Sequence, residues 1–293
     1  MREEDRFIIA NSKKIGIGAY GLLLAILVGG ALWFCFDLAR ERNRIIGDRT
    51  QIALEKSKFM SQWLRNIFLS GDYVMRDVRE KVKPSDLINA RPEEIERICT
   101  WLGEKAATVP GVVGVAIYDS NLIYRAGNEK KTIGFRSNQI KPSSLTDQIE
   151  DKVRFQYIPI EKSATKMPMI LINRWIFSQN GKFMGGVAAA IDLNFSQNWF
   201  QSFNVGPGDV LALMDGEGTL LARNPATLAA LGKKTNLFQD QSNINKISGS
   251  SSFISLSPID GVKRIYGITR MEEVPIVLTV GYDLNNALAE WRN

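Results

Sequence analysis

The feature that most constrains this chain is an apolar run near its N-terminus, from Ile15 to Phe36 (IGIGAYGLLLAILVGGALWFCF), which contains no charged residue. A helix of that length covers the hydrocarbon core of a bilayer, roughly 30 Å thick. The run ends in Trp-Phe-Cys-Phe, which suits an aromatic belt at the membrane surface and not the cleavage site of a signal peptide. A buried core helix, the alternative, normally keeps a polar stripe. We therefore predict an uncleaved transmembrane helix.

The charges around this run leave its orientation open. Positive residues usually mark the cytoplasmic side of a membrane helix. Here four basic residues lie on each side: Arg2, Arg6, Lys13 and Lys14 before the run, and Arg40, Arg42, Arg44 and Arg49 after it. The orientation must therefore come from another argument.

Composition narrows the range of functions. The formal charge is +6, but Lys and Arg form no run or aromatic-interleaved stripe that would follow a phosphate backbone, so we expect no nucleic-acid partner. The absence of histidine removes His-containing metal sites, Ser-His-Asp and Cys-His nucleophiles, and the usual general base near neutral pH. Cys35 and Cys99 are the only cysteines, so there is no disulfide framework. We expect no enzyme, cofactor or metal site in this sequence.

Two helices are predicted after the membrane segment. The first is long, from Leu38 to about Val82, because apolar residues recur at helical spacing and no proline occurs before Pro84. Its early spacing is near-heptad, which suits either dimerisation or packing on a sheet; both alternatives stay open, and we expect a homodimer through this helix. The second runs from about Pro92 to Ala107, since proline and the glutamates that follow suit a first turn.

After Pro110 the pattern changes to short strands. Residues 112–128 (VVGVAIYDSNLIYRAGN) predict a strand, a turn from Asp119 and a second strand, because β-branched runs are interrupted by turn formers. The polar stretch 129–152 predicts a loop with a short helix. Three further strands are predicted over 154–160, 169–177 and 183–193, the last two joined by a Gln-Asn-Gly-Lys hairpin turn. Together they indicate a small antiparallel sheet flanked by helices.

A second copy of this arrangement follows. Residues 209–225 (DVLALMDGEGTLLARNP) repeat the strand, Asp-turn, strand layout of 112–128, at an offset of roughly 90 to 96 residues. The stretch 264–285 likewise ends in VLTVGYDLN, much as 174–194 ends in GVAAAIDLN. Between the copies, 194–203 predicts a short helix and 205–208 (VGPG) a linker. The sequence therefore predicts two tandem sheet units that divide near Phe203.

The chain resembles the tandem (double) Cache, or PDC-type, sensor domains in the order of its parts. These parts are the membrane helix, the long helix, the turn at Asp119, the Arg174 strand leading through NGKFMGGVAAAIDLNF, and the Asp215-Gly216 turn followed by LLARNP. The likeness covers nearly the whole chain and is greatest to sensor regions that precede bacterial diguanylate cyclase domains. It implies an α+β fold: an N-terminal transmembrane helix, a long stalk helix and two PAS-like antiparallel-sheet units in tandem.

The resemblance also implies location and domain limits. It places the bulk of the chain in the periplasm and anchors it, single-pass, in the cell inner membrane. The expected segments are a cytoplasmic N-terminus (1–14), the transmembrane helix (15–36), the stalk helix (37–83), a membrane-distal unit (84–203), a membrane-proximal unit (204–285) and the start of an exit segment (286–293).

The function implied by the resemblance is ligand sensing by a membrane-bound bacterial receptor. Members of this family continue into a second membrane helix and a cytoplasmic output domain. This chain stops at Ala-Glu-Trp-Arg-Asn and has no Gly-Gly-Asp/Glu-Glu-Phe signature, so we expect no output activity in it. The alternative is a membrane-tethered small-molecule binding protein with no output domain. A membrane-anchored hydrolase has no nucleophile motif to support it.

Arg174 is the first candidate for a ligand contact. Alternation in MILINRWIF puts it on one face of a strand with three isoleucines. A guanidinium in such surroundings is costly unless it is paired. Either Asp192 or Asp119 pairs with it inside the fold, or the carboxylate of an anionic ligand does.

Other residues complete the candidate site. Tyr157 and Trp175 are expected to wall a pocket, and the three alanines of 188–190 leave room for a small molecule, although core packing explains them equally well. The amino-acid-binding branch of the family carries a Tyr, Arg, Trp-Tyr and Asp pattern. This chain matches it poorly, so an amino-acid ligand is not supported. Asp119 and Asp215 begin turns and are expected to cap their own backbone instead of binding a metal.

Overall fold

The computed structural model describes residues 3–88, 90–137, 153–159, 162–163, 168–237, 249–272 and 274–292, with the backbone alone for 3–19, 228 and 290. The chain divides into two compact units. One is Met1–Arg49 with Leu284–Asn293, and the other is Thr50–Asp283. Helix α1 (Glu3–Lys81) contributes residues to both.

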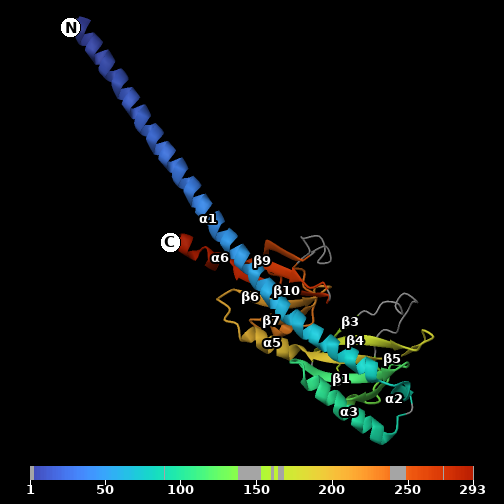
Figure 1. Cartoon of the computed structure of the whole chain (residues 1–293). Helices are drawn as coiled ribbons and strands as arrows, with labels where there is room; N and C mark the ends of the chain where they lie inside the picture. The colour runs from blue at the N-terminus through green and yellow to red at the C-terminus, as the bar shows by residue number, and fades with distance from the viewer. Residues whose placement is uncertain are drawn as a thin grey trace. The chain divides into compact units, whose positions relative to one another are not determined.

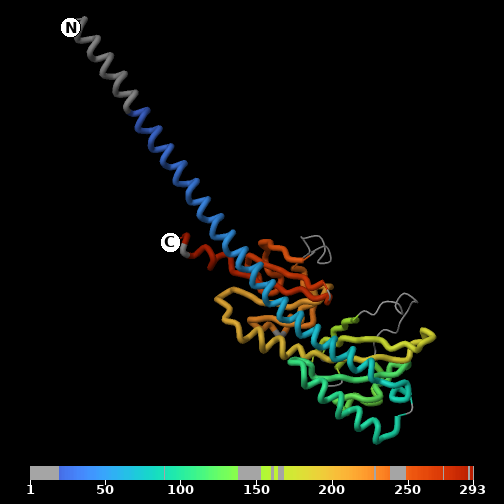
Figure 2. The backbone as a smooth tube through the Cα atoms, in the orientation of Figure 1, coloured from blue at the N-terminus to red at the C-terminus, as the bar shows by residue number. Residues whose placement is uncertain are grey.

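The smaller unit contains the apolar part of α1 and two short helices, α6 (Leu284–Ala287) and α7 (Ala289–Arg292). By length and composition α1 is able to cross a membrane. Its apolar side chains in this part are exposed, Leu27 by 61% and Phe36 by 67%, as a lipid-facing helix requires. The helix continues without a break into the larger unit (Figure 2), which agrees with a membrane helix followed by a long stalk helix.

The larger unit holds the end of α1, helices α2 (Pro84–Ile88) and α3 (Pro92–Ala107), and a first antiparallel sheet in the order β2-β1-β5-β4-β3 (Figure 1). Its strands are β1 (Val112–Asp119), β2 (Tyr124–Gly127), β3 (Arg154–Ile158), β4 (Met169–Phe177) and β5 (Phe183–Asp192). A single 3-10 turn, η1 (Lys130–Thr132), follows β2.

Helix α5 (Leu193–Gln201) leads into a second sheet of the same topology, in the order β7-β6-β10-β9-β8. Its strands are β6 (Val210–Asp215), β7 (Leu220–Asn224), β8 (Ser250–Leu256), β9 (Lys263–Arg270) and β10 (Ile276–Asp283), with the 3-10 turn η3 (Leu228–Ala230) after β7. The two sheets in tandem confirm the predicted α+β fold class.

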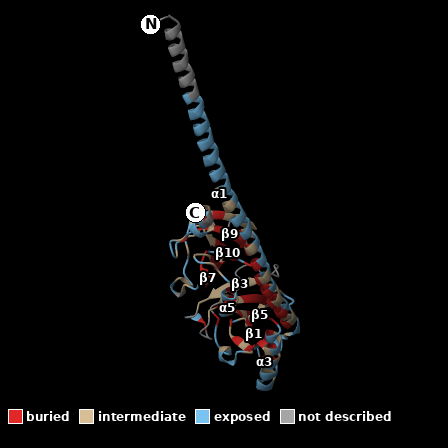
Figure 3. Ribbon diagram, turned by 90° about the vertical axis from the view of Figure 1, so that its left-hand side faces the viewer, coloured by how far each residue is buried: buried red, intermediate tan, exposed pale blue. Residues whose placement is uncertain are grey.

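Residues 50–81 of α1 pack on one face of both sheets. Met60, Leu64 and Met75 are at most 1% exposed, and they share one core cluster with Ile172 of the first sheet and Leu278 of the second. The helix backbone lies directly against the second sheet at Gly267, where an added Cβ would come within 2.3 Å of the Ala53 carbonyl carbon. Buried residues gather along this contact (Figure 3). Of the two alternatives for the long helix, packing on a sheet is observed.

Several predicted elements match closely. The helix 92–107 and the strand 169–177 have the predicted bounds, while the strand predicted over 154–160 ends at Ile158. The stretch 129–152, where a loop with a short helix was expected, begins with the 3-10 turn η1, and 138–152 lies outside the described residues, so the short helix stays a prediction. Helix α2 and strand β8 were not predicted. The domain limits at 83/84 and 203/204 stay a prediction.

Candidate functional site

Arg174 lies on the face of the first sheet that α1 covers. Its side chain is 1% exposed, and its Nε and Nη2 donate hydrogen bonds to Oδ1 and Oδ2 of Asp72 on α1, at 2.5 and 2.8 Å. This forked geometry is the strong form of an arginine–carboxylate pair. Oδ2 of Asp72 also accepts a hydrogen bond from Arg76, at 3.0 Å. Arg174 is therefore paired inside the fold, as one alternative expected.

The two expected partners of Arg174 have other roles. Oδ1 of Asp119 accepts hydrogen bonds from the backbone of Asn121 and Ile123, and Oδ2 accepts from Arg125, at 2.5 and 2.9 Å. The side chain of Asp192 caps α5 by accepting from the Asn194 backbone. The prediction that one of these aspartates pairs with Arg174 is wrong: the acceptor lies 102 residues before Arg174 in the sequence. The turn interpretation of Asp119 is confirmed.

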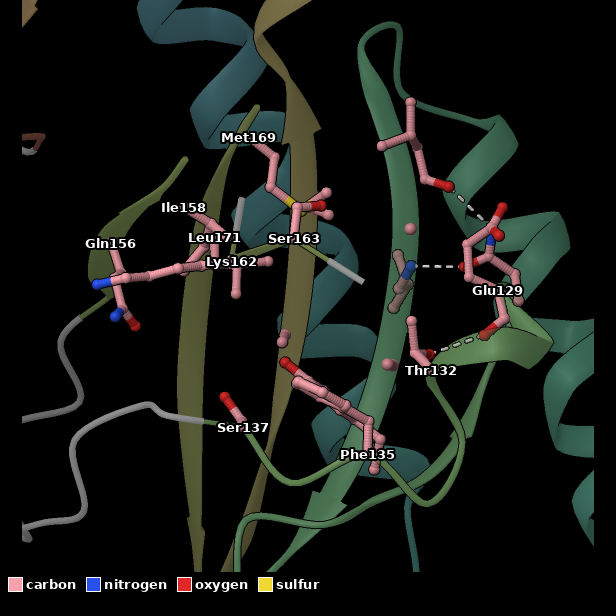
Figure 4. Close-up of a pocket in the computed structure, with 18 of the residues that line it drawn as sticks. Glu129, Thr132, Phe135, Ser137, Gln156, Ile158, Lys162, Ser163, Met169 and Leu171 are labelled. Atoms are coloured by element: carbon pink, nitrogen blue, oxygen red, sulfur yellow. Dashed lines mark hydrogen bonds between the residues drawn. The ribbon is translucent and has the colours of Figure 1, made fainter. Parts of the chain in front are cut away.

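A cavity of about 280 Å³ lies on the opposite face of the same sheet (Figure 4). Small residues form its floor, Gly114 and Ala116 on β1 and Ala188 and Ala190 on β5. Larger apolar residues complete the lining: Val113, Tyr124, Phe135, Ile158, Pro159, Met169 and Leu171. The floor is low because these four side chains have at most one carbon atom, so the volume above the strands stays open.

Polar groups lie around this apolar space. Glu129 and Lys162 are the charged side chains among its described lining residues, and they stand on opposite sides of the cavity in Figure 4. Gln156, Ser163, Ser137 and Thr132 add polar atoms. Tyr124 is 9% exposed, and burial raises the pKa of its hydroxyl, which stays neutral.

The amide of Asn128 shapes one wall of the cavity. Its Oδ1 accepts a hydrogen bond from the Val115 backbone at 2.7 Å, and its Nδ2 donates to the Val113 carbonyl at 3.0 Å. The side chain thereby holds β1 at the point where Gly114 leaves space. Its role here is to fix the wall.

Of the predicted site residues, Arg174 does not line the cavity, and Tyr157 borders it while its side chain packs against the core on the opposite face of the sheet. Trp175 is buried on the cavity face of β4 but belongs to an adjoining aromatic cluster with Phe177 and Phe183. Two of the three alanines, 188 and 190, line the cavity, whereas Ala189 packs in the core.

Sequence reasoning missed Arg154, whose guanidinium lies 3.3 Å from the centroid of the Trp175 ring. It also missed Lys162 and Glu129. The sequence does contain a signal that separates the two faces of this sheet. Alternation along β4 puts Leu171 and Trp175 on the face opposite to Arg174.

Comparison with known proteins agrees with this architecture. Residues 193–281 match the family model dCache_1_like, described as a histidine kinase sensor domain. The chain has the tandem Cache fold. The extracellular domain of rpHK1S-Z16 is similar at a TM-score of 0.67 and 20% identity, covering 84% of this chain and 98% of that one. No match was found among curated protein sequences.

Two chemoreceptor domains are similar as well. The periplasmic sensory domain of the Campylobacter jejuni chemoreceptor Tlp1 has a TM-score of 0.63 at 11% identity, covering 83% of this chain and 98% of that one. The ligand-binding domain of the Pseudomonas fluorescens chemoreceptor CtaA, in complex with L-isoleucine, has a TM-score of 0.57 at 16% identity, covering 85% and 96%. The shared feature is the fold.

Proposed function

We propose that this chain is the extracytoplasmic ligand-sensing region of a membrane-bound bacterial receptor, and that it binds a small molecule in the cavity of its first sheet. The observation that carries the proposal is that cavity, about 280 Å³ over a floor of glycine and alanine. The family match of residues 193–281 and the fold shared with chemoreceptor sensory domains support it. A membrane-tethered binding protein without an output domain is the alternative.

The lining chemistry suggests a ligand with an apolar body and polar groups at its ends. The apolar body would lie over Ala188 and Ala190, and the polar ends would face Glu129 and Lys162. The expectation of an anionic ligand rested on Arg174, which is paired with Asp72; a ligand carboxylate would meet Lys162 instead. Amino acids are the first compounds to test, since CtaA was crystallised with L-isoleucine.

Helix α1 is the proposed route of the signal. It is continuous from the predicted membrane segment to Asp72, which pairs with the sheet that carries the cavity. In this proposal the bulk of the chain is periplasmic, residues 1–14 are cytoplasmic and the chain is anchored in the inner membrane. Output through a diguanylate cyclase stays a prediction from resemblance.

The stalk helix also carries a surface suited to a second copy of the chain. Helix α1 packs on both sheets, yet three of its large apolar side chains stay exposed: Ile52 by 43%, Phe59 by 62% and Tyr73 by 67%. With the exposed Asn66 they form a stripe at seven-residue spacing, and an asparagine within such a stripe fixes the register of parallel helices. A parallel homodimer through this stripe is part of the proposal.

The cavity is tested by thermal unfolding of the full chain in detergent with the twenty L-amino acids and small carboxylates. A ligand at 100 times its Kd should stabilise the fold by about 2.7 kcal/mol. Ala188→Leu should abolish that response because leucine fills the cavity floor, whereas Thr279→Val, at the corresponding place in the second sheet, should keep it. Equal stabilisation of Ala188→Leu and wild type would move the site elsewhere.

The dimer is tested separately by light scattering of the detergent-solubilised chain. Phe59→Glu should convert a dimer into a monomer, because it puts a charge in the centre of the stripe. Lys58→Glu, at the exposed neighbouring position, is the matched control and should stay dimeric. A monomeric wild type would end this part of the proposal and leave the cavity untouched.

A further inference from the structure

Three charged side chains form a cluster on the second sheet. They lie on the face that corresponds to the cavity face of the first sheet. Arg223 of β7 and Arg264 of β9 are 4% and 2% exposed, and both guanidinium groups meet the carboxylate of Asp260. Nη1 and Nη2 of Arg264 donate to Oδ1 and Oδ2 at 2.8 Å each, and Nη2 of Arg223 donates to Oδ2 at 2.5 Å. The arginines thus hold one carboxylate in a fork.

The arginines have their own supports, independent of Asp260. Nε of Arg264 donates to the Gly208 carbonyl at 2.5 Å, and Nη1 of Arg223 donates to the Pro225 carbonyl at 3.0 Å and to the Thr227 hydroxyl. These bonds aim both guanidinium groups at the same point. They are pre-organised for a carboxylate in the way that a receptor site must be.

The strand register identifies the residues of the first sheet that correspond to the two arginines. Met169 pairs with Asp192, and Arg264 pairs with the corresponding Asp283, so arginine replaces methionine. On the other edge, Gly127 pairs with Ala116 of the first sheet, while Arg223 pairs with Ala212 of the second. Arg264 therefore takes the position of Met169, which lines the cavity of the first sheet, and Arg223 takes the position of Gly127. The space left in the second sheet is about 20 Å³, lined by Arg223, Tyr266 and Thr279 among others.

Asp260 differs from its partners because it belongs to a surface turn. Residues 257–262 connect β8 and β9, and the Asp260 side chain is 30% exposed. The turn has its own hydrogen bonds, from the Ser257 backbone to the Val262 carbonyl and from the Gly261 backbone to the Ser257 carbonyl, at 2.9 Å each. The carboxylate thus enters the arginine pair from outside, as a ligand would.

We infer that Arg223 and Arg264 form a second binding site, specific for a carboxylate, and that Asp260 of the chain itself occupies it. The site is closed to free carboxylates because a tethered group is present at an effective concentration of millimolar or more. The second sheet is in this sense self-liganded. This inference does not rest on the proposed function, since it concerns the other sheet.

The test is chemical rescue by formate in the full chain, in detergent and at constant ionic strength. Asp260→Ala should lower the midpoint of thermal unfolding by about 5 °C or more, because it leaves two buried guanidinium charges without the carboxylate that neutralises them. Sodium formate should then raise the midpoint along a saturation curve and restore most of the loss. Half of the effect is expected on the order of 10 mM, as suits a ligand of three non-hydrogen atoms.

Two variants keep the result specific. Asp215→Ala loses an aspartate that caps backbone amides of Glu217 and Thr219 and pairs with no arginine among the described residues, so formate should not rescue it beyond the wild type. Asp260→Ala combined with Arg264→Met, the residue of the first sheet, should lose the saturable rescue. If Asp260→Ala folds poorly, its refolding yield in formate and in chloride gives the same comparison. Equal response to formate in Asp260→Ala and Asp215→Ala would overturn the inference.

Discussion

The two sheets of this protein share strand order and register, yet one carries a cavity of about 280 Å³ and the other about 20 Å³. The difference lies in a few side chains on one face. Where the first sheet has Gly127, Met169 and Ala188, the second has Arg223, Arg264 and Thr279. The same backbone therefore makes a pocket or a closed charge cluster, according to the volume and charge placed on that face.

A second difference lies on the opposite face, where both sheets bind α1. Arg174 and Thr269 occupy corresponding positions of β4 and β9, since Met169 corresponds to Arg264. Arg174 pairs with Asp72, and the Thr269 hydroxyl shares a hydrogen bond of 2.8 Å with Ser57. These contacts are roughly 22 Å apart along the helix. The sheet with the cavity thus holds α1 by a buried ion pair and the other by a neutral hydrogen bond.

The largest effect is expected from breaking the ion pair. Arg174→Met leaves the Asp72 carboxylate buried with Arg76, itself half exposed, as its remaining partner, so the free energy of unfolding should fall by about 3–5 kcal/mol. Urea unfolding of the full chain measures it. The double variant Arg174→Met with Asp72→Leu should recover much of the loss, because the unpaired charge is gone. A loss below about 1 kcal/mol in the single variant would show that the pair is solvated.

The charge cluster of the second sheet should show its own dependence on pH. Burial alone would raise the pKa of Asp260, but hydrogen bonds from Arg264 and Ser257 outweigh it and hold the pKa below the ordinary 3.8. A lowered folded pKa stabilises the protein above pH 3.8 and loses that contribution as the pH falls through the folded value. Asp260→Asn should therefore cost about 3 kcal/mol at pH 7, and the difference from wild type should narrow only below about pH 4. A difference that is constant from pH 7 to pH 3 would exclude a charge-based role.

The strand pattern of the first sheet could be predicted because alternation and turn formers act within a few residues. The bounds of β4 and the separation of Leu171 from Arg174 follow from period two. The burial cost of a guanidinium also marked Arg174 correctly as a residue that needs an acceptor. The acceptor itself could not be found, since Asp72 lies on a distant helix and only the packing of α1 brings the two together.

Strand β8 was missed for a related reason. Its sequence SSSFISL has few β-branched residues and lies at the edge of its sheet, so its pairing with β9 and not its composition makes it a strand. The cavity was hidden from the sequence too, because Gly114 and Ala116 read as ordinary small residues of a strand. Their meaning appears only when β1 and β5 are side by side.

The two sheets differ in free volume, so the same alanine-to-leucine substitution should change the stability of the protein differently in each. This effect is expected to be smaller than the two above. Ala116 and Ala212 occupy corresponding positions, opposite Ala188 and Thr279. Ala116→Leu adds three carbon atoms next to a large cavity and should change stability little, whereas Ala212→Leu must displace packed neighbours and should cost about 1–3 kcal/mol. Thermal unfolding of both variants without ligand measures the difference. Equal costs would mean that the first cavity is filled in solution.

The smallest effect is expected at the second contact with α1. Thr269→Val keeps the shape of the side chain and removes its hydroxyl, which bonds Ser57 at 2.8 Å and Ser250 at 3.0 Å. The Ser57 hydroxyl also bonds the Leu54 carbonyl at 2.9 Å, so it keeps an acceptor and the cost should be about 1 kcal/mol. Urea unfolding compares it with Arg174→Met at the corresponding position. If Thr269→Val lowers the free energy of unfolding as much as Arg174→Met does, the neutral contact stabilises the packing of α1 as strongly as the ion pair. The contrast between the two sheets would then not hold on this face.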